Sequence, residues 1–233
     1  MILKIKIEFR FLLEHRLGLI RPNDIYSISK WLIKKNLPKE PVIIDCGAHI
    51  GRDSIDLSRV MPRAQIHSFE AAPDVFAKLE SNTSKYKNIR CYPIALSNKS
   101  GDADFYLSSG NSDGSSSLLE PTGHLENHPN VFFEKNIKVK TLTLDDWALE
   151  QNIMFVDLLW LDMQGFELPM LQASKEILKN VKIIHAEVSL KETYKGVETY
   201  PVFRKWLESK GFQVIKEALP SGTDMGNVLF IRK

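Results

Sequence analysis

Apolar residues in the middle and later parts of this chain gather in short runs, and between the runs they recur at helical spacing. Short continuous runs are typical of strands buried on both faces, whereas spacings of three and four are typical of helices. The alternation begins at residue 42 and predicts βαβ units, in which helices cover both faces of a parallel sheet. The strands predicted for this sheet are 42–44, 65–69, 89–96, 156–161 and 181–188.

Helices are predicted between these strands, and several have recognisable ends. Pro73 suits the first turn of a helix, Thr143 suits an N-cap, and Gly211 suits the position just after a helix. An antiparallel hairpin of 212–216 with 228–231 is predicted to close the chain. The predicted helices are 52–60, one from Pro73 through Leu79, a short one that carries Trp147, 168–178 and 200–210.

One stretch interrupts the pattern. An extra strand at the sheet edge is predicted at 103–107, and a further strand at 136–144. Between them lie residues 108–130, and the ten positions from 108 to 117 contain six serines and two glycines. A loop of this length in a compact domain is usually a functional lid or a disordered insertion, and we favour a lid.

Residues 1–40 precede the alternation and are predicted to form an N-terminal helical extension. The apolar positions in 5–17 fit both strand and helix spacing, and we favour a helix. Its apolar face would pack on the main domain or on a second subunit, with a membrane surface as the alternative. A homodimer is therefore a reasonable expectation. A second helix, capped by Asn23 or Asp24, is expected to end before Pro38.

Length and composition place this chain among globular proteins. It has 233 residues, 43% of them hydrophobic and 26% charged, which fits one domain, 41–233, with the extension as an appendage. The formal net charge of +2 gives no reason to expect a nucleic-acid partner. Cys46 and Cys91 are too few for a disulfide framework and are expected to be reduced. Because no stretch resembles a membrane span or a signal peptide, we expect a cytoplasmic protein.

Candidate chemistry first appears at Asp45-Cys46-Gly47-Ala48-His49-Ile50-Gly51, where the first strand should turn into the first helix. Ligands of open α/β sheets bind outside the carboxyl ends of the strands, and Gly47 and Gly51 allow the backbone to approach one closely. A nicotinamide-binding turn begins with a glycine that admits the pyrophosphate, but here that position is Asp45. A carboxylate repels phosphate and attracts an ammonium group. The ligand is therefore expected to be cationic at one end and free of phosphate.

Glu70 supplies a second signal, at the end of the second predicted strand. It follows Gly51 by 19 residues, which matches the acidic residue about 20 positions on that accepts hydrogen bonds from ribose hydroxyls. S-adenosylmethionine is a nucleoside with a cationic, phosphate-free tail. The two signals together predict that this cofactor binds here, although either one alone is weak.

These residues and several others resemble the FkbM-type branch of class I S-adenosylmethionine-dependent methyltransferases. The resemblance spans roughly residues 42–190, and its most specific part is Leu161-Asp162-Met163-Gln164-Gly165-Phe166-Glu167-Leu168. It implies a Rossmann-like, seven-stranded, mostly parallel sheet with an antiparallel last strand. It also implies methyl transfer to an oxygen, commonly on sugars, polysaccharide precursors or polyketide-like metabolites. His49 is a departure, since many methyltransferases have Gly or a small polar residue there. The other matching segments are the Asp45 to Gly51 turn, Phe69-Glu70, Ile94 to Ser97 followed by Gly101, and Ser116 to Leu118.

Carried onto this sequence, the resemblance implies which residues hold the cofactor. Asp45 and the backbone of the Gly47–Gly51 turn would hold the methionine part, and Glu70 the ribose. Ala95 and Leu96 would lie against the adenine. The full set of expected cofactor contacts is Asp45, Gly47, Ala48, His49, Gly51, Glu70, Ala71, Ala95, Leu96, Ser117, Asp162 and Gln164.

Methyl transfer to a hydroxyl requires alignment of oxygen, methyl and sulfur, and it benefits from a base that takes the hydroxyl proton. The candidate bases are Asp162, Glu187 and, from the loops, His124. Asp162 suits equally well an anchor for the cofactor's amine or for the neighbouring turn. His185, which alternates with Glu187, is interpreted as a core histidine. Magnesium held by Asp162, Glu167 and Glu187 is an alternative that we do not favour, because nothing in their spacing demands it.

Two other functions remain open at this point. A nicotinamide-dependent oxidoreductase has a similar sheet, but Asp45 argues against it. A non-catalytic cofactor-binding scaffold would bind the cofactor without methyl transfer, and changes at Asp162 or Glu187 would leave its function intact. The expected partner is a small-molecule or sugar acceptor that the sequence does not name. Residues that form either part of an acceptor pocket or a solvated loop are Lys191, Tyr194, Lys195 and Tyr200.

Overall fold

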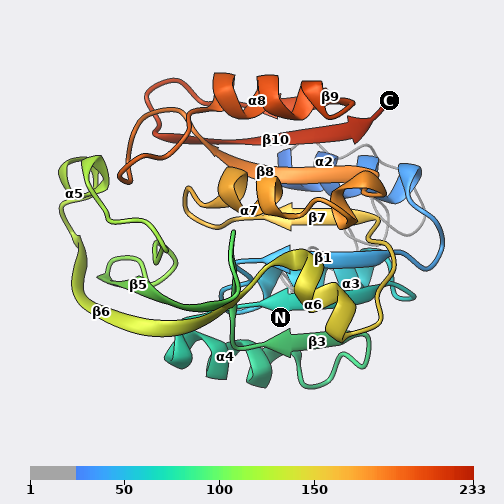
Figure 1. Cartoon of the computed structure of the whole chain (residues 1–233), viewed down its shortest axis with the longest axis horizontal. Coiled ribbons are helices and arrows are strands. Elements are labelled where there is room, and N and C mark those ends of the chain that lie inside the picture. Colours follow the sequence, from blue (N-terminus) through green and yellow to red (C-terminus); the bar gives the residue numbers. More distant parts are fainter. Residues whose placement is uncertain (1–24) are drawn as a thin grey trace, which may run out of the picture.

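The structure, a computed structural model, describes residues 25–233. A seven-stranded sheet forms its centre, in the order β3-β2-β1-β7-β8-β10-β9 (Figure 1). Neighbours from β3 to β8 run parallel, whereas β10 is antiparallel to both β8 and β9. This is the mostly parallel sheet with an antiparallel last strand that the sequence predicts. Its strands are β1 (Val42–Cys46), β2 (Gln65–Phe69), β3 (Ile89–Tyr92), β7 (Leu158–Leu161), β8 (Ile183–Ser189), β9 (Phe212–Ala218) and β10 (Met225–Arg232).

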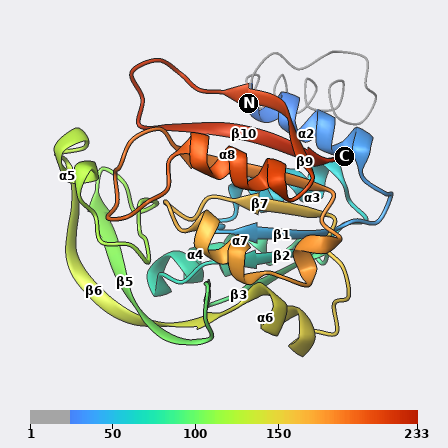
Figure 2. The ribbon, with the colours of Figure 1, turned by 45° about the horizontal axis from the view of Figure 1, so that its top comes forward.

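Helices cover both faces of this sheet (Figure 2). On one face, α2 and α3 pack around Ile33 and Leu57, which are fully buried. On the other face, α6, α7 and α8 enclose a larger core that includes Trp147 and Phe203. The strands are buried on both sides for this reason, and their apolar runs are the expected consequence. The helices are α2 (Ile25–Asn36), α3 (Arg52–Val60), α4 (Pro73–Thr83), α5 (Gly123–Asn127), α6 (Leu144–Glu150), α7 (Glu167–Ala173) and α8 (Tyr200–Ser209), with the 3₁₀ turn η2 (Ile177–Lys179).

Most predicted helix ends are confirmed, and one predicted helix is wrong. Pro73 opens α4, and the Thr143 hydroxyl caps α6 by accepting from the Asp146 amide at 3.0 Å. Residues 168–178 do not form one helix, because the chain leaves helical geometry at Ser174 and continues in η2. The Asp145 carboxylate accepts hydrogen bonds from the amides of residues 176 and 177 at 2.9 Å, which offers these amides partners outside a continuous helix.

A second, three-stranded sheet corrects the prediction for residues 89–107. The predicted strand 89–96 is two strands, β3 and the short β4 (Ala95–Leu96), which joins the second sheet. Pro93 lies between them, and its missing amide hydrogen does not allow the ladder to continue unbroken. The predicted edge strand is part of β5 (Gly101–Gly110), which pairs with β6 (Val131–Leu142) rather than with the main sheet. We call residues 101–142 the arm.

The predicted loop 108–130 is shorter and more ordered than the sequence indicates. The strands of the arm extend to Gly110 and begin again at Val131, and α5 occupies part of the segment between them. Ser115 and Ser117 are buried, and Ser117 forms a β-bridge with Tyr106. The serines that suggest a mobile loop are therefore largely used in hydrogen bonds within the arm.

The second predicted N-terminal helix is α2, which ends at Asn36 before Pro38. Its predicted cap, the helix expected earlier in residues 1–40 and the apolar face of 5–17 expected to contact a second subunit lie outside the described residues. Among residues 25–233, no helix combines the length and the apolar character needed to cross a membrane. Cys46 and Cys91 are free thiols, the first buried and the second half-buried.

Candidate active site

The carboxyl ends of β1, β2, β7 and β8 meet at one edge of the sheet, and the strand order reverses between β1 and β7. Ligands of open α/β sheets bind outside this edge. The arm extends past the same edge, with α5 at its far end (Figure 1). Two neighbouring cavities lie here, between the strand ends and the arm.

The first cavity gathers most of the predicted cofactor contacts. Its walls come from the turn after β1, the end of β2, β4, the segment after β7 and the arm. Four predicted contacts do not line it, and these are Asp45, Ala48, Gly51 and Ser117. The predicted contacts that do line it are Gly47, His49, Glu70, Ala71, Ala95, Leu96, Asp162 and Gln164.

The turn after β1 lies directly against the segment that follows β7. Gly47 has φ +78°, and a Cβ there would collide with the carbonyl oxygen of Asp162. The amides of Gly47 and Ala48 both donate to the carbonyl of Phe69, at 3.0 and 2.8 Å, which fixes the turn to the end of β2. A glycine is therefore required at position 47 both for its backbone angle and for space. Because it has no side chain at position 47, the same turn leaves room at the cavity wall for the amino-acid end of a ligand.

Asp45 lies beneath this turn and does not line the cavity, so its contact with the methionine part stays a prediction. Its carboxylate is fully buried and accepts a hydrogen bond from the Ser54 hydroxyl, which also lies 2.6 Å from the Ser68 hydroxyl. Burial, reinforced by the nearby Asp53, raises the pKa of Asp45 to about 7. The carboxyl group thus joins β1 to the start of α3 and supports the turn from below.

The other three residues outside the cavity also support its walls. The Ala48 side chain is buried, and Gly51 stands before α3, where a Cβ would lie 2.8 Å from Leu79 Cδ1 on α4. The hydroxyl of Ser117 donates to the carbonyl of Gln164 at 2.9 Å. In this structure these positions support the walls and do not face the cavity, and their predicted contact with the cofactor stays a prediction.

Glu70 lines the cavity at the end of β2 with both carboxylate oxygens already engaged. Oε2 accepts from the His49 amide at 3.0 Å, and Oε1 accepts from the Ala72 amide at 2.8 Å. Burial raises the pKa of Glu70, and the two amide hydrogen bonds oppose this effect. Each oxygen keeps a further lone pair, so the carboxylate is oriented and can still accept hydrogen bonds from ribose hydroxyls.

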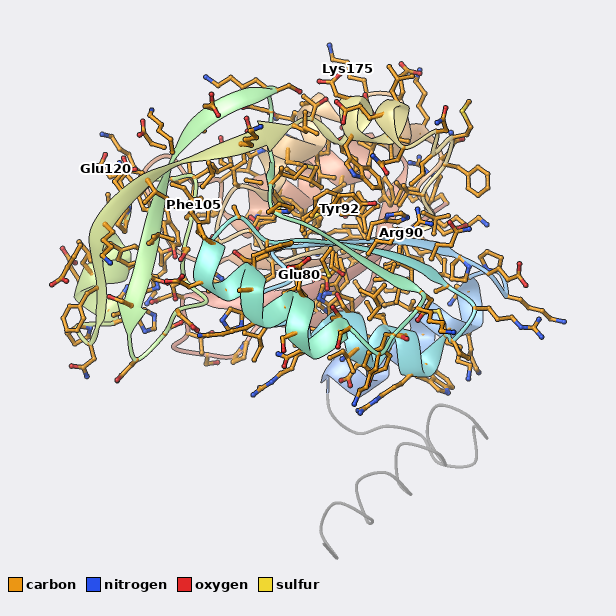
Figure 3. The ribbon with its side chains drawn as sticks, turned by 90° about the horizontal axis from the view of Figure 1, so that it is seen from below. Glu80, Arg90, Tyr92, Phe105, Glu120 and Lys175 are labelled. Carbon is orange, nitrogen blue, oxygen red and sulfur yellow. The ribbon has the colours of Figure 1, made fainter. Side chains whose placement is uncertain are left out.

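Apolar side chains form the remaining wall of the first cavity. Phe69 comes from β2, Ile94 from the link between β3 and β4, and Leu96 from β4, and the arm adds Phe105. Phe105 is buried in a cluster with Ala72 and Val75, and Figure 3 shows it near one end of α4. These side chains provide a flat apolar slot next to Glu70, which suits a purine base. Phe105 was missed by the sequence reasoning, because nothing in a single β5 strand indicates that it faces this cavity.

Three polar side chains meet at the inner end of the cavity. Gln164 Nε2 donates to Asp162 Oδ1 at 2.9 Å and to Glu187 Oε2 at 2.8 Å. The carboxyl groups of Asp162 and Glu187 therefore share one amide donor and lie close to each other. Burial, followed by the charge of Asp162, raises the pKa of Glu187 well above its usual value. Glu187 therefore holds the proton of this pair, and Asp162 carries the negative charge.

Tyr194 fixes the orientation of Gln164, and sequence reasoning left its role open. It is fully buried, and its hydroxyl lies 3.0 Å from Gln164 Oε1 and 2.7 Å from the carbonyl oxygen of Ser115. With the amide oxygen directed at Tyr194, the amide nitrogen is directed at the two carboxyl groups. Gln164 also has a positive φ of 52°, which only a surrounding network of this kind is expected to stabilise.

The second cavity adjoins the first at His49, Asp113, Gly114 and Gln164, which line both. Its volume is about 540 Å³, and Glu187 and His124 line it as well. The structure therefore brings together Asp162, Glu187 and Gln164 and places His124 on another wall of the same space. Burial lowers the pKa of His124, so its imidazole is neutral near pH 7.

A pair of ion contacts holds the arm over both cavities. Asp113 Oδ1 lies 2.7 Å from His49 Nε2, and its Oδ2 lies 3.0 Å from Lys78 Nζ on α4. We call His49, Lys78 and Asp113 the clasp. Hydrogen bonding from Lys78 and His49 lowers the pKa of Asp113, which is therefore ionised near neutral pH. The departure from the family at His49 thus coincides with a contact to the arm.

The acidic residues considered for magnesium are not arranged around one point. Glu167 turns back on its own segment, where Oε1 accepts from the Met163 amide at 2.7 Å. Burial raises the pKa of Glu167 to about 7. Within residues 25–233, no group of three or more His, Cys, Asp or Glu side chains has the geometry to hold a metal ion.

The histidine and tyrosines nearby have separate places. His185 is buried on β8 and stacks on Trp160 with ring centroids 3.7 Å apart, in agreement with the core interpretation. Burial lowers the pKa of His185 to about 3. The hydroxyl of Tyr200 donates to Glu217, away from the cavities. Of the residues after β8 for which a pocket or a loop was considered, Tyr194 is the one in contact with Gln164, whose amide nitrogen donates to the acidic pair.

The fold and the first cavity together define the class of protein. Three features fit S-adenosylmethionine: a glycine turn with room for an amino-acid end, a strand-end carboxylate and an apolar slot. The sheet order is that of class I methyltransferases. The family description "Methyltransferase FkbM domain" matches residues 45–214. The chain therefore belongs to the FkbM methyltransferase family and is an S-adenosylmethionine-dependent methyltransferase.

Individual relatives agree with this assignment. The 2-O-methyltransferase NoeI of Sinorhizobium fredii (strain NBRC 101917 / NGR234) is 31% identical over 184 residues, which cover 77% of this chain and 76% of NoeI. The methyltransferase sdnD of Sordaria araneosa is 25% identical over 230 residues, or 85% of this chain and 83% of the relative.

Solved structures share the fold at low sequence identity. Methyltransferase FkbM from Methylobacillus flagellatus KT has a TM-score of 0.53 and 14% identity, covering 95% of this chain and 47% of that one. Aeropyrum pernix fibrillarin, solved with natively bound S-adenosyl-L-methionine, has a TM-score of 0.51 and 14% identity, covering 84% of this chain and 69% of that one.

Proposed function

We propose that this methyltransferase transfers the methyl group to a hydroxyl oxygen of a small molecule or of a sugar or glycan precursor. The observation that carries the proposal is the second, polar cavity, which meets the cofactor cavity at Gln164 and the Asp162–Glu187 pair. An acceptor in the second cavity would present an oxygen beside a carboxylate and close to the cofactor. The similarity to NoeI, named as a 2-O-methyltransferase, supports transfer to oxygen.

The chemistry divides between the cofactor and the chain. When bound, S-adenosylmethionine supplies an electrophilic methyl group on a sulfonium ion. The two cavities align the acceptor with that methyl group, and alignment of this kind contributes up to about 7–11 kcal/mol in favourable systems. A positioned base adds typically about 10²- to 10⁴-fold.

Asp162 is the base favoured by this geometry. It lines the cofactor cavity, it carries the charge of the acidic pair, and burial raises its pKa, which makes it a stronger base than an exposed aspartate. Glu187 holds a proton, because burial and the charge of Asp162 raise its pKa, and Gln164 donates to both carboxyl groups. His124, neutral and on another wall, is the alternative acceptor for the proton.

The polar lining favours a polyhydroxylated acceptor. Side chains with hydroxyl, amide, imidazole and carboxyl groups line the second cavity, including Asn111, Ser112 and Thr193. Such groups pair with sugar hydroxyls and leave an aromatic or aliphatic acceptor poorly matched. We therefore place sugars ahead of other hydroxylated molecules.

The test combines binding and turnover. Calorimetric titration with S-adenosylhomocysteine should show micromolar binding, and a nicotinamide dinucleotide should show none. The enzyme with S-adenosylmethionine should then methylate at least one member of a panel of sugars and other hydroxylated molecules, read as S-adenosylhomocysteine release. Binding without turnover on any acceptor would favour a scaffold instead, and binding of the dinucleotide would favour an oxidoreductase.

A further inference from the structure

The second cavity also carries information about the charge of the acceptor, if the proposed function is correct. Among the described residues that line it there is no lysine or arginine. Two carboxylates, Asp113 and Asp224, do line it. The cavity is thus negative at two points, one on the arm and one directly before β10.

Each of these carboxylates already has a lysine and a histidine beside it. Lys191 Nζ lies 2.8 Å from Asp224 Oδ1, and His128 Nε2 lies 3.4 Å from Asp224 Oδ2. Lys78 and His49 pair with Asp113 in the clasp. A phosphate group in this cavity would meet carboxylates and would have to break an existing ion pair to gain a cation. An uncharged acceptor meets neither obstacle.

Two buried polar atoms on one wall have no hydrogen-bond partner among residues 25–233. These are His124 Nδ1 and Thr193 Oγ1, and both residues line the second cavity. The backbone holds the two residues together, since the His124 amide donates to the Thr193 carbonyl at 3.0 Å. An unsatisfied buried polar group costs about 1–3 kcal/mol, so native proteins seldom keep one without a ligand or an ordered water.

We propose that the second cavity takes an uncharged glycoside or polyol rather than a phosphate-bearing sugar, and that His124 and Thr193 bind a hydroxyl of it other than the one that is methylated. The negative lining excludes the phosphate, and the unpaired imidazole nitrogen and hydroxyl select a second hydroxyl group. Specificity for the acceptor then lies in the segment around α5 and in the residues after β8, at a distance from the cofactor.

The first experiment compares two forms of the same sugars. Methyl glycosides and the corresponding glycosyl 1-phosphates are assayed as acceptors, and the methyl glycoside should have a kcat/KM at least about 10-fold higher. Asp224→Asn removes a negative charge and frees Lys191 from its ion pair. In this variant the ratio of kcat/KM for the methyl glycoside to kcat/KM for the glycosyl 1-phosphate should be smaller. A wild-type preference for the phosphates overturns the inference and leaves the proposed function standing. Absence of methylation with every hydroxylated acceptor contradicts the proposed function itself.

The second experiment tests the unpaired hydroxyl. Thr193→Val keeps the side-chain shape and removes the hydroxyl, and it should raise the KM for the acceptor about 5- to 10-fold with unchanged affinity for S-adenosylhomocysteine. Thr193→Ser keeps the hydroxyl and should preserve the KM. If Thr193→Val raises thermal stability and leaves the acceptor KM unchanged, the hydroxyl has no ligand and the assignment of this wall is wrong.

Discussion

The cofactor half and the acceptor half of this site are built in different ways. The cofactor half consists of the walls from residues 46–96, from the segment after β7 and from part of the arm, with backbone turns, one strand-end carboxylate and apolar side chains. The acceptor half consists of the walls from 111–131, 187–193 and 224–225. Side-chain hydrogen bonds and ion pairs between distant segments hold this second half together.

The difference shows which half can change without loss of the fold. In the cofactor half, main-chain atoms touch each other, so that even one added carbon atom collides with a neighbouring strand end. In the acceptor half, single contacts such as the Lys191–Asp224 pair join segments that other contacts also hold. A family with this construction can keep one cofactor and vary its acceptor.

The comparison meets its strongest test at Gly47. Gly47→Ala adds a Cβ that collides with the Asp162 carbonyl at a positive φ, so we expect a loss of more than about 3 kcal/mol in the free energy of unfolding. Binding of S-adenosylhomocysteine should be lost. Gly196→Ala is the matched control, because Gly196 has φ +72° with nothing within 4 Å, and it should cost about 1 kcal/mol. Equal thermal denaturation of the two variants would show that the collision is relieved and that the turn is not rigid.

Asp162 tests the border between the halves. Asp162→Asn should lower kcat by about 10²- to 10⁴-fold and change the affinity for S-adenosylhomocysteine far less, because the carboxylate is needed for proton removal. In the wild type, the base works only when deprotonated. Its raised pKa therefore makes kcat fall, as the pH is lowered, at a higher pH than an exposed aspartate would give. A larger effect on binding than on turnover would make Asp162 an anchor for the cofactor.

Glu70 sharpens the comparison from the cofactor side. Glu70→Gln keeps the shape but removes a charged acceptor of ribose hydrogen bonds, so calorimetry should show S-adenosylhomocysteine bound about 10- to 100-fold more weakly. The KM for the acceptor should stay within about twofold of the wild-type value. Glu80 is an exposed residue of α4, and Glu80→Gln provides the control. This variant should bind S-adenosylhomocysteine with the wild-type affinity. An altered acceptor preference in Glu70→Gln would mean that the two halves are not separable at this residue.

Tyr194 gives the smallest expected change and tests the acceptor side. Tyr194→Phe removes the hydroxyl that orients Gln164, so kcat should fall about 10-fold and its pH dependence should shift, because the Asp162–Glu187 pair loses a fixed donor. Affinity for S-adenosylhomocysteine should not change. Tyr86→Phe, at a half-buried position outside both cavities, is the control. If the pH dependence of kcat in Tyr194→Phe is identical to that of the wild type, the hydroxyl does not orient Gln164 and Tyr194 acts only through packing.

The same division explains how much of the molecule the sequence predicts. The turn at Gly47 and Gly51, Glu70 at the end of β2 and Asp162 after β7 all lie at strand ends, and apolar runs locate strand ends well. The residues that they contact either lie close to them in the sequence or are brought beside them by the parallel pairing of the strands. The cofactor half is therefore largely predictable, although the inward position of Asp45 is not, because spacing does not tell which side of a turn a carboxylate takes.

The acceptor half depends on pairings between segments far apart in the chain. Tyr194 reaches Gln164 and the carbonyl of Ser115, across 30 and 79 positions of sequence. Likewise, the serines of 108–117 resemble a mobile loop until β5 is seen paired with β6. No periodicity in a single segment encodes such contacts, and the second sheet with its arm was missed for this reason.

Asp113 of the clasp and its neighbour Gly114 line both cavities, so this segment links the binding of one substrate to the binding of the other. If a ligand in one cavity stabilises a particular position of this segment, the ligand of the other cavity meets the segment in that position. Binding linkage is reciprocal, so the factor by which S-adenosylmethionine changes the affinity for the acceptor equals the factor by which the acceptor changes the affinity for S-adenosylmethionine. Because the two cavities share this wall, any change that one substrate causes in the affinity for the other is mutual.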